Sequence, residues 1–227
     1  MGVQLPRWVW MGTALLACMA GMVNVVGYLG FEHQAVTHLT GTTTLLGSAV
    51  AHGDTRALLH LAGVALAFVS GAALSGLIVQ DSTLRLGRRY GIALILESLL
   101  LFAAIPLFGH GRLAGALLAA MACGLQNAMA TTYSGAVIRT SHLSGMFTDL
   151  GIGLGHALRG LPLQKRRLLL CALIITSFFI GAVLGAWLFA RIGHAALAVP
   201  ASAAGIAGLA YTAWRQLQLR HDLRSTD

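Results

Sequence analysis

Six apolar runs, each long enough to span a membrane, constrain the fold of this chain more than any other feature of its sequence. They cover residues 8–29, 56–79, 90–108, 113–132, 168–189 and 195–217. A helix needs about 20 residues to cross a hydrocarbon core of about 30 Å. With 57% apolar and only 10% charged residues, the chain is typical of a multi-pass membrane protein and not of a water-soluble domain. We therefore expect the lipid bilayer to surround it.

The basic residues fit the same interpretation. The formal charge of +8 would suit a nucleic-acid-binding protein, but the Lys and Arg residues fall between the apolar runs. That pattern is typical of loops beside a membrane, so we expect no nucleic-acid partner. Cys18, Cys123 and Cys171 lie singly inside apolar runs, which predicts packing residues rather than disulfides or metal ligands.

A motif near the start of the chain is repeated in its second half. Residues 38–52 read HLTGTTTLLGSAVAH and residues 142–156 read HLSGMFTDLGIGLGH, with seven of fifteen positions identical. Similar pairs flank the motif, at residues 21–24 and 124–127 and at residues 71–75 and 181–185. Self-similarity at a fixed spacing indicates an internal repeat. We therefore predict two repeats, residues 1–110 and 111–227.

The repeated motif itself is too short to cross the bilayer. From Gly41 to His52 is twelve residues, or about 18 Å of helix. If each motif enters and leaves on one side, the Lys and Arg residues divide 12 to 3 between the two sides; if both cross, they divide 10 to 5. Cytoplasmic loops carry the excess of Lys and Arg. The counts therefore predict re-entrant segments, residues 36–52 and 140–156, with both termini in the cytoplasm.

This topology makes the two repeats inverted, because three spans per repeat is an odd number. The predicted fold is an all-α membrane protein with six transmembrane helices and two short re-entrant half-helices. Transporters built this way bind their ligand near the bilayer midplane, where the interrupted helices meet. Non-helical backbone at that depth is tolerated where it lines a cavity, and helix N-termini bring partial positive charge there.

Several short pieces of the chain resemble one known family. They are Thr40-Gly41, Leu46-Gly47, Glu97, residues 124–128 (GLQNA), Arg139-Thr140, Gly145 and residues 148–151 (TDLG). They resemble the YoaK-type family of bacterial inner-membrane proteins, a domain of unknown function, over nearly the whole chain. The resemblance implies a six-span protein of the bacterial inner membrane and supplies no substrate. This chain departs from the family pattern at Asn24, where Asp is common, and at Thr42, where Asn is frequent.

The tips of the two motifs carry the first candidate residues. Gly41 and Gly145 would let the backbone turn without a Cβ clash, and the hydroxyls of Thr40 and Ser144 stand where helix N-caps are expected. Two roles are open for the motif histidines: capping exposed backbone, or contacting a solute or proton. The predicted solute-binding set is His38, Thr40, Gly41, Thr44, Asn24, Asn127, His142, Ser144, Gly145 and Thr148.

Two acidic residues lie deep inside the predicted membrane segments. Glu97 is seven residues into the third run, and Asp149 lies within the second motif. Ionisable residues at such depth are costly and indicate function, here proton or ion coupling together with Arg139. The alternative is a structural ion pair between Asp149 and Arg139. His52 and His156 end the motifs at opposite mouths, so we predict no metal site.

Two classes of function remain open. The repeats and re-entrant segments favour a channel or secondary transporter for a small polar solute or anion. Coupling of that transport to protons is left open. The alternative is a non-transporting membrane protein with a sensing, assembly or lipid-handling role. No P-loop, catalytic triad or metalloprotease motif is present in the sequence, so we predict neither an enzyme nor a cofactor.

Overall fold

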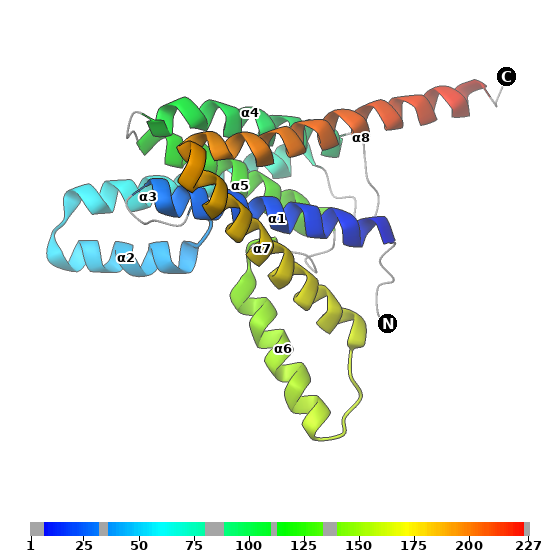
Figure 1. Ribbon diagram of the computed structural model, residues 1–227, viewed down its shortest axis with the longest axis horizontal. Coiled ribbons are helices and arrows are strands. Elements are labelled where there is room, and N and C mark those ends of the chain that lie inside the picture. Colours follow the sequence, from blue (N-terminus) through cyan, green and yellow to red (C-terminus); the bar gives the residue numbers. More distant parts are fainter. Residues whose placement is uncertain (1–6, 32–35, 80–88, 110–112, 134–139, 225–227) are drawn as a thin grey trace.

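The computed structural model describes residues 7–31, 36–79, 89–109, 113–133 and 140–224, and the regular structure in these ranges is entirely helical. The all-α prediction is thereby confirmed. Each long helix covers one predicted apolar run, and all but α8, which extends beyond its run to Arg224, end close to the limits of that run (Figure 1). The helices are α1 (Arg7–Gly30), α2 (Leu39–His52), α3 (Thr55–Ile78), α4 (Arg89–Gly109), α5 (Leu113–Tyr133), α6 (Leu143–Leu158), α7 (Lys165–Ile192), the 3₁₀ helix η1 (Gly193–Leu197) and α8 (Ala198–Arg224).

Five helical segments of the described chain are long and apolar enough to cross a membrane. Four of them are α1, α3, α4 and α5. The fifth, Lys165–Gln218, comprises α7, η1 and most of α8, because η1 joins these two long helices directly. The protein is therefore a multi-pass membrane protein. By contrast, α2 with 14 residues and α6 with 16 residues are about 21 and 24 Å long, shorter than the hydrocarbon core of about 30 Å.

Each short helix forms a hairpin with the long helix that follows it. Gly53, with φ of 67°, ends α2, and the carboxylate of Asp54 accepts the backbone N–H of Ala57 to start α3. Gly160, also with φ of 67°, lies in the turn between α6 and α7. Such a φ is readily adopted only by glycine. Figure 1 shows both hairpins, with α6 and the start of α7 extending away from the other helices.

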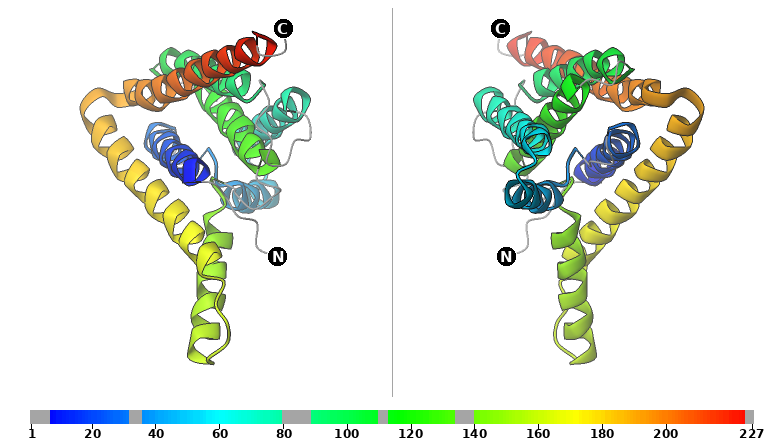
Figure 2. Two further views of the ribbon diagram at one scale, coloured as in Figure 1. Left: turned by 90° about the vertical axis from the view of Figure 1, so that its right-hand side faces the viewer. Right: turned by 90° about the vertical axis from the view of Figure 1, so that its left-hand side faces the viewer.

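Corresponding parts of the sequence repeat pack in the same way. α1 packs along α7, and α3 packs along α5. A Cβ on Gly21 would meet the backbone oxygen of Phe178, and one on Gly124 would meet that of Phe68. The reciprocal glycines behave alike, because Gly181 faces the Cys18 oxygen and Gly71 the Met121 oxygen. Small residues of this kind let membrane helices approach closely, and Figure 2 shows the two pairs flanking the centre of the molecule.

The buried apolar side chains form two clusters, one at each end of the bundle. The Tyr90 cluster gathers the start of α1, α4 and α7 with the end of α3 and α5. The Phe108 cluster gathers the opposite ends of those helices together with η1 and the start of α8. α1, α4 and α7 therefore run from the Tyr90 cluster to the Phe108 cluster, and α3, α5 and α8 run back. Of the two short helices, only α6 contributes described residues to a cluster, and it contributes to the Tyr90 cluster alone.

Candidate functional site

The N-terminal ends of α2 and α6 meet in one cavity. His38 is the N-cap of α2 and His142 is the N-cap of α6, and both side chains line a cavity of about 400 Å³. The middle of α3 and the last turns of α5 form the rest of the wall. Two helix starts that lie more than a hundred residues apart in the sequence therefore share one hollow.

The cavity wall is rich in hydrogen-bonding groups. The first N–H groups of an α-helix have no partner within that helix, and neither N-cap histidine provides a side-chain cap. The N-termini also carry partial positive charge. The cavity is consequently suited to a small neutral polar solute or a small anion, which can accept hydrogen bonds from such ends.

The two tip glycines have a different role from the predicted one. Gly41 and Gly145 lie inside α2 and α6, and neither has a positive φ. A Cβ on Gly41 would meet the ring of His38, and one on Gly145 would meet the ring of His142. The glycines therefore make room for the N-cap ring of their own helix. The sequence-based assignment of Thr40 and Ser144 as N-caps was also wrong, because the histidines occupy those positions.

Five of the ten predicted solute-binding residues line the cavity: His38, Thr40, Asn127, His142 and Ser144. Two of the others, Thr44 and Thr148, donate their hydroxyls to backbone oxygens of their own helices, those of Thr40 (3.0 Å) and Ser144 (2.9 Å). Asn24, Gly41 and Gly145 also lie outside the described cavity wall.

Asn24 and Asn127 occupy equivalent positions in the two repeats but differ in their bonding. The hydroxyl and the backbone N–H of Thr37 both donate to Oδ1 of Asn24, at 2.6 and 3.2 Å. This contact ties the residues before α2 to the last two turns of α1. Asn127 Oδ1 and Thr140 Oγ1 are buried, and neither has a hydrogen-bond partner in the described part of the chain. The described part of the second repeat therefore has buried polar atoms without a partner, where the first repeat has a hydrogen-bonded pair.

Asp149 pairs with a residue other than the predicted one. Its carboxylate accepts hydrogen bonds from Nη2 and Nε of Arg167, at 2.8 and 3.2 Å, across the α6–α7 hairpin. The predicted partner, Arg139, lies outside the described residues. The negative charge of Asp149 is thus compensated by Arg167 at the hairpin, away from the cavity wall.

Glu97 is buried in the bundle interior. Its side chain is 1% exposed on α4, and its Oε2 has no hydrogen-bond partner within the described ranges. None of the described cavity residues comes from α4. A carboxylate buried at this depth without a counter-charge is costly.

The comparison with protein families matches residues 12–210 to a family described as "Protein of unknown function (DUF1275)". The chain belongs to this family. The finer YoaK-type label stays a prediction. No curated protein and no solved structure matched the chain.

This DUF1275 protein has cavity residues that the motif comparison missed. Thr37 and Ser141 directly precede the two N-cap histidines, and Thr131 and Thr132 lie one turn beyond Asn127 on α5. Phe68 and Ala72 come from α3. Thr131 and Thr132 carried a signal, because together with Gln126 and Asn127 they place four polar side chains near the end of an apolar run. Phe68 and Ala72 carried none, since their type is ordinary for a membrane helix.

Proposed function

We propose that this protein is a channel or secondary transporter for a small polar solute or anion in the bacterial inner membrane. One observation carries the proposal: the N-termini of α2 and α6 converge on a single cavity with a polar wall. The solute would bind between His38 and His142, with Asn127 and the hydroxyls of Thr40 and Ser144 as further contacts. No reaction chemistry is assigned to the protein.

The proposed topology has six spans and two re-entrant helices, arranged as inverted repeats of residues 1–110 and 111–227. The helix directions support it, because α1, α4 and α7 run one way between the two clusters and α3, α5 and α8 run the other way. A full crossing by α2 would instead make α1 and α3 parallel. The equivalent glycine contacts of the α1–α7 and α3–α5 pairs give further support. With the 12 to 3 division of Lys and Arg, both termini would be cytoplasmic.

Proton coupling, if the transport is coupled, is assigned to Glu97. It is buried, and its Oε2 has no hydrogen-bond partner in the described chain, which suits a group that gains and loses a proton. Asp149 is instead assigned a structural role, because Arg167 already neutralises it. Arg139 keeps its proposed coupling role, close in sequence to Thr140 and His142.

The second candidate function is a membrane protein that does not transport, with a sensing, assembly or lipid-handling role. Its supporting observation is that buried apolar side chains fill both ends of the bundle. A binding cavity that serves only to sense a solute would bind it without flux. The two functions therefore differ in a measurable way.

The test is solute flux into liposomes that contain the purified protein. Small anions, weak acids, neutral polar solutes, protons and metal ions should be screened with and without a pH gradient. We expect flux above protein-free liposomes for at least one anion or neutral solute, and we expect His38→Ala/His142→Ala to reduce it strongly. The matched control is His52→Ala/His156→Ala, which changes the two exposed histidines at the other ends of the same helices.

Two results would contradict the proposal. Binding without flux for every solute in the screen would favour the sensing role. Equal flux in the His38→Ala/His142→Ala variant and in the wild type, at equal protein abundance, would remove the tip histidines from the solute path.

A further inference from the structure

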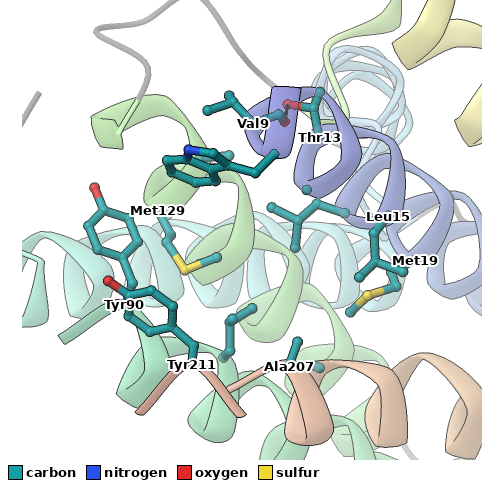
Figure 3. Close-up of a pocket in the computed structure, with 14 residues that line it drawn as sticks. Val9, Thr13, Leu15, Met19, Tyr90, Met129, Ala207 and Tyr211 are labelled. Carbon is teal, nitrogen blue, oxygen red and sulfur yellow. Dashed lines mark hydrogen bonds between the residues drawn. The ribbon is translucent and has the colours of Figure 1, made fainter. Parts of the chain in front are cut away.

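A second cavity lies between α1, α4, α5 and α8, apart from the one at the helix tips. Its volume is about 210 Å³, and its wall is almost wholly apolar. Figure 3 shows Val9, Leu15 and Met19 of α1 opposite Ala207 of α8, with Tyr90 and Tyr211 at one end. The one hydroxyl on the α1 side, that of Thr13, donates to the backbone oxygen of Val9 at 2.7 Å. It is therefore already satisfied and offers little to a polar ligand.

This cavity lies in the half of the bundle that contains the Tyr90 cluster, and it reaches the lipid-facing surface. Val9, Tyr90 and Met129 belong both to the cavity wall and to that cluster. Two further wall residues face outward, Trp8 with 49% and Leu15 with 44% of its surface exposed. Water is disfavoured in an apolar space that offers no polar partners. A hollow of this kind, open to hydrocarbon, is suited to a lipid acyl chain.

Positive charge lies beside one end of the cavity. Arg89 is exposed and directly precedes Tyr90, and Arg215 is half-buried one turn after Tyr211. The two ends are neighbours, because a Cβ on Gly91 at the start of α4 would meet Thr212 of α8. Arginines and aromatic rings at a membrane interface attract anionic lipid headgroups. An apolar hollow with two arginines beside its aromatic end matches the form of an anionic phospholipid.

We propose that this cavity is a binding site for one anionic phospholipid. An acyl chain fills the space between α1 and α8, and the phosphate lies near Arg89 and Arg215. The lipid fills the gap between two helices that make few direct contacts with one another. This site is separate from the tip cavity, and it holds whether or not the protein transports a solute.

Gly12 allows a direct test. It lines the cavity, and a Cβ built on it would meet no atom within 4 Å, so Gly12→Leu fills the space without moving the backbone. The matched control is Gly76→Leu on α3, where a Cβ also meets nothing within 4 Å but the residue is exposed and outside the cavity. Lipid retained by the detergent-purified protein would be measured by native mass spectrometry, with phosphatidylglycerol and phosphatidylcholine of identical chains as probes.

We expect the wild type and Gly76→Leu to retain one phosphatidylglycerol, and Gly12→Leu to retain several-fold less. Arg89→Gln/Arg215→Gln should lose the preference for phosphatidylglycerol over phosphatidylcholine. Arg159→Gln/Arg166→Gln removes the same charge from exposed positions of the α6–α7 hairpin and should keep the preference. Equal retention of the two lipids by the wild type would overturn the proposal. So would unchanged retention in Gly12→Leu, or equal losses in the two glycine variants.

Discussion

The N-cap rings of His38 and His142 lie over glycines of their own helices, and this residue-scale contact shapes the candidate solute site. Each glycine is three residues after its histidine, and a Cβ at either would meet the ring. Both helices contain a second shared glycine, Gly47 in α2 and Gly151 in α6, where a Cβ would meet nothing within 4 Å. Gly47 and Gly151 are therefore natural controls for the effect of adding a Cβ atom at Gly41 and Gly145.

We predict that Gly41→Ala and Gly145→Ala each displace a histidine ring, while Gly47→Ala and Gly151→Ala do not. A side chain forced from its rotamer costs about 1 kcal/mol, whereas alanine stabilises a helix interior by up to about 1 kcal/mol over glycine. Thermal unfolding in detergent should therefore rank each tip variant below its control, and solute flux should fall only in the tip variants. Identical unfolding and flux in the two sets would contradict this role of the tip glycines.

At the scale of elements, two helix pairs depend on backbone-to-backbone contact. α1 and α7 meet at Gly21 and Gly181, and α3 and α5 meet at Gly71 and Gly124. The Cβ atom of any other residue would lie against a backbone oxygen of the facing helix, which cannot swing aside as a side chain can. Close approach of this kind holds membrane helices together through dispersion and weak polar contacts.

We predict that Gly21→Ala and Gly124→Ala destabilise the protein to a similar extent. Overpacking a tight contact costs about 1–3 kcal/mol, and the two glycines face equivalent carbonyls. Unfolding in detergent measures the effect, with Gly76→Ala as the control in open space. A large loss in one variant and none in the other would mean that the two helix pairs are not equivalent.

At the scale of the whole molecule, the proposed inverted repeats require the α2–α3 and α6–α7 hairpins to enter the membrane from opposite sides. The exposed residues Ala51, at the end of α2, and Ala157, at the end of α6, lie far from the shared cavity. We predict that cysteines at these two positions react with a membrane-impermeant maleimide from opposite sides of the membrane. Alanine would first replace Cys18, Cys123 and Cys171, so that only the new thiols report. Labelling of both from the same side would contradict inverted repeats.

Local patterns in the chain were enough to predict the helices and the duplication. The thickness of the bilayer sets the length of an apolar run, so the limits of α1, α3, α4 and α5 follow closely from hydrophobicity. α8 instead continues to Arg224, past the end of its apolar run at Leu217. The two short helices are predicted from the repeat, because identical residues such as Gly47 and Gly151 can be matched in the sequence without knowing which helices pack together. The lateral arrangement does not follow in this way. Lipid surrounds every apolar face equally well, so hydrophobicity gives no preference for one helix neighbour over another.

The packed structure was needed for the partners of individual side chains. Arg167 reaches Asp149 because the α6–α7 turn folds one helix back on the other. The histidine rings settle on Gly41 and Gly145 because the N-cap geometry of a helix directs them there. The two cavities arise where α3 and α5 meet the helix tips, and where α1 and α8 diverge. Each of these contacts depends on the angle and depth at which helices cross. Backbone contacts across the bundle set that geometry, and no run of neighbouring residues encodes it.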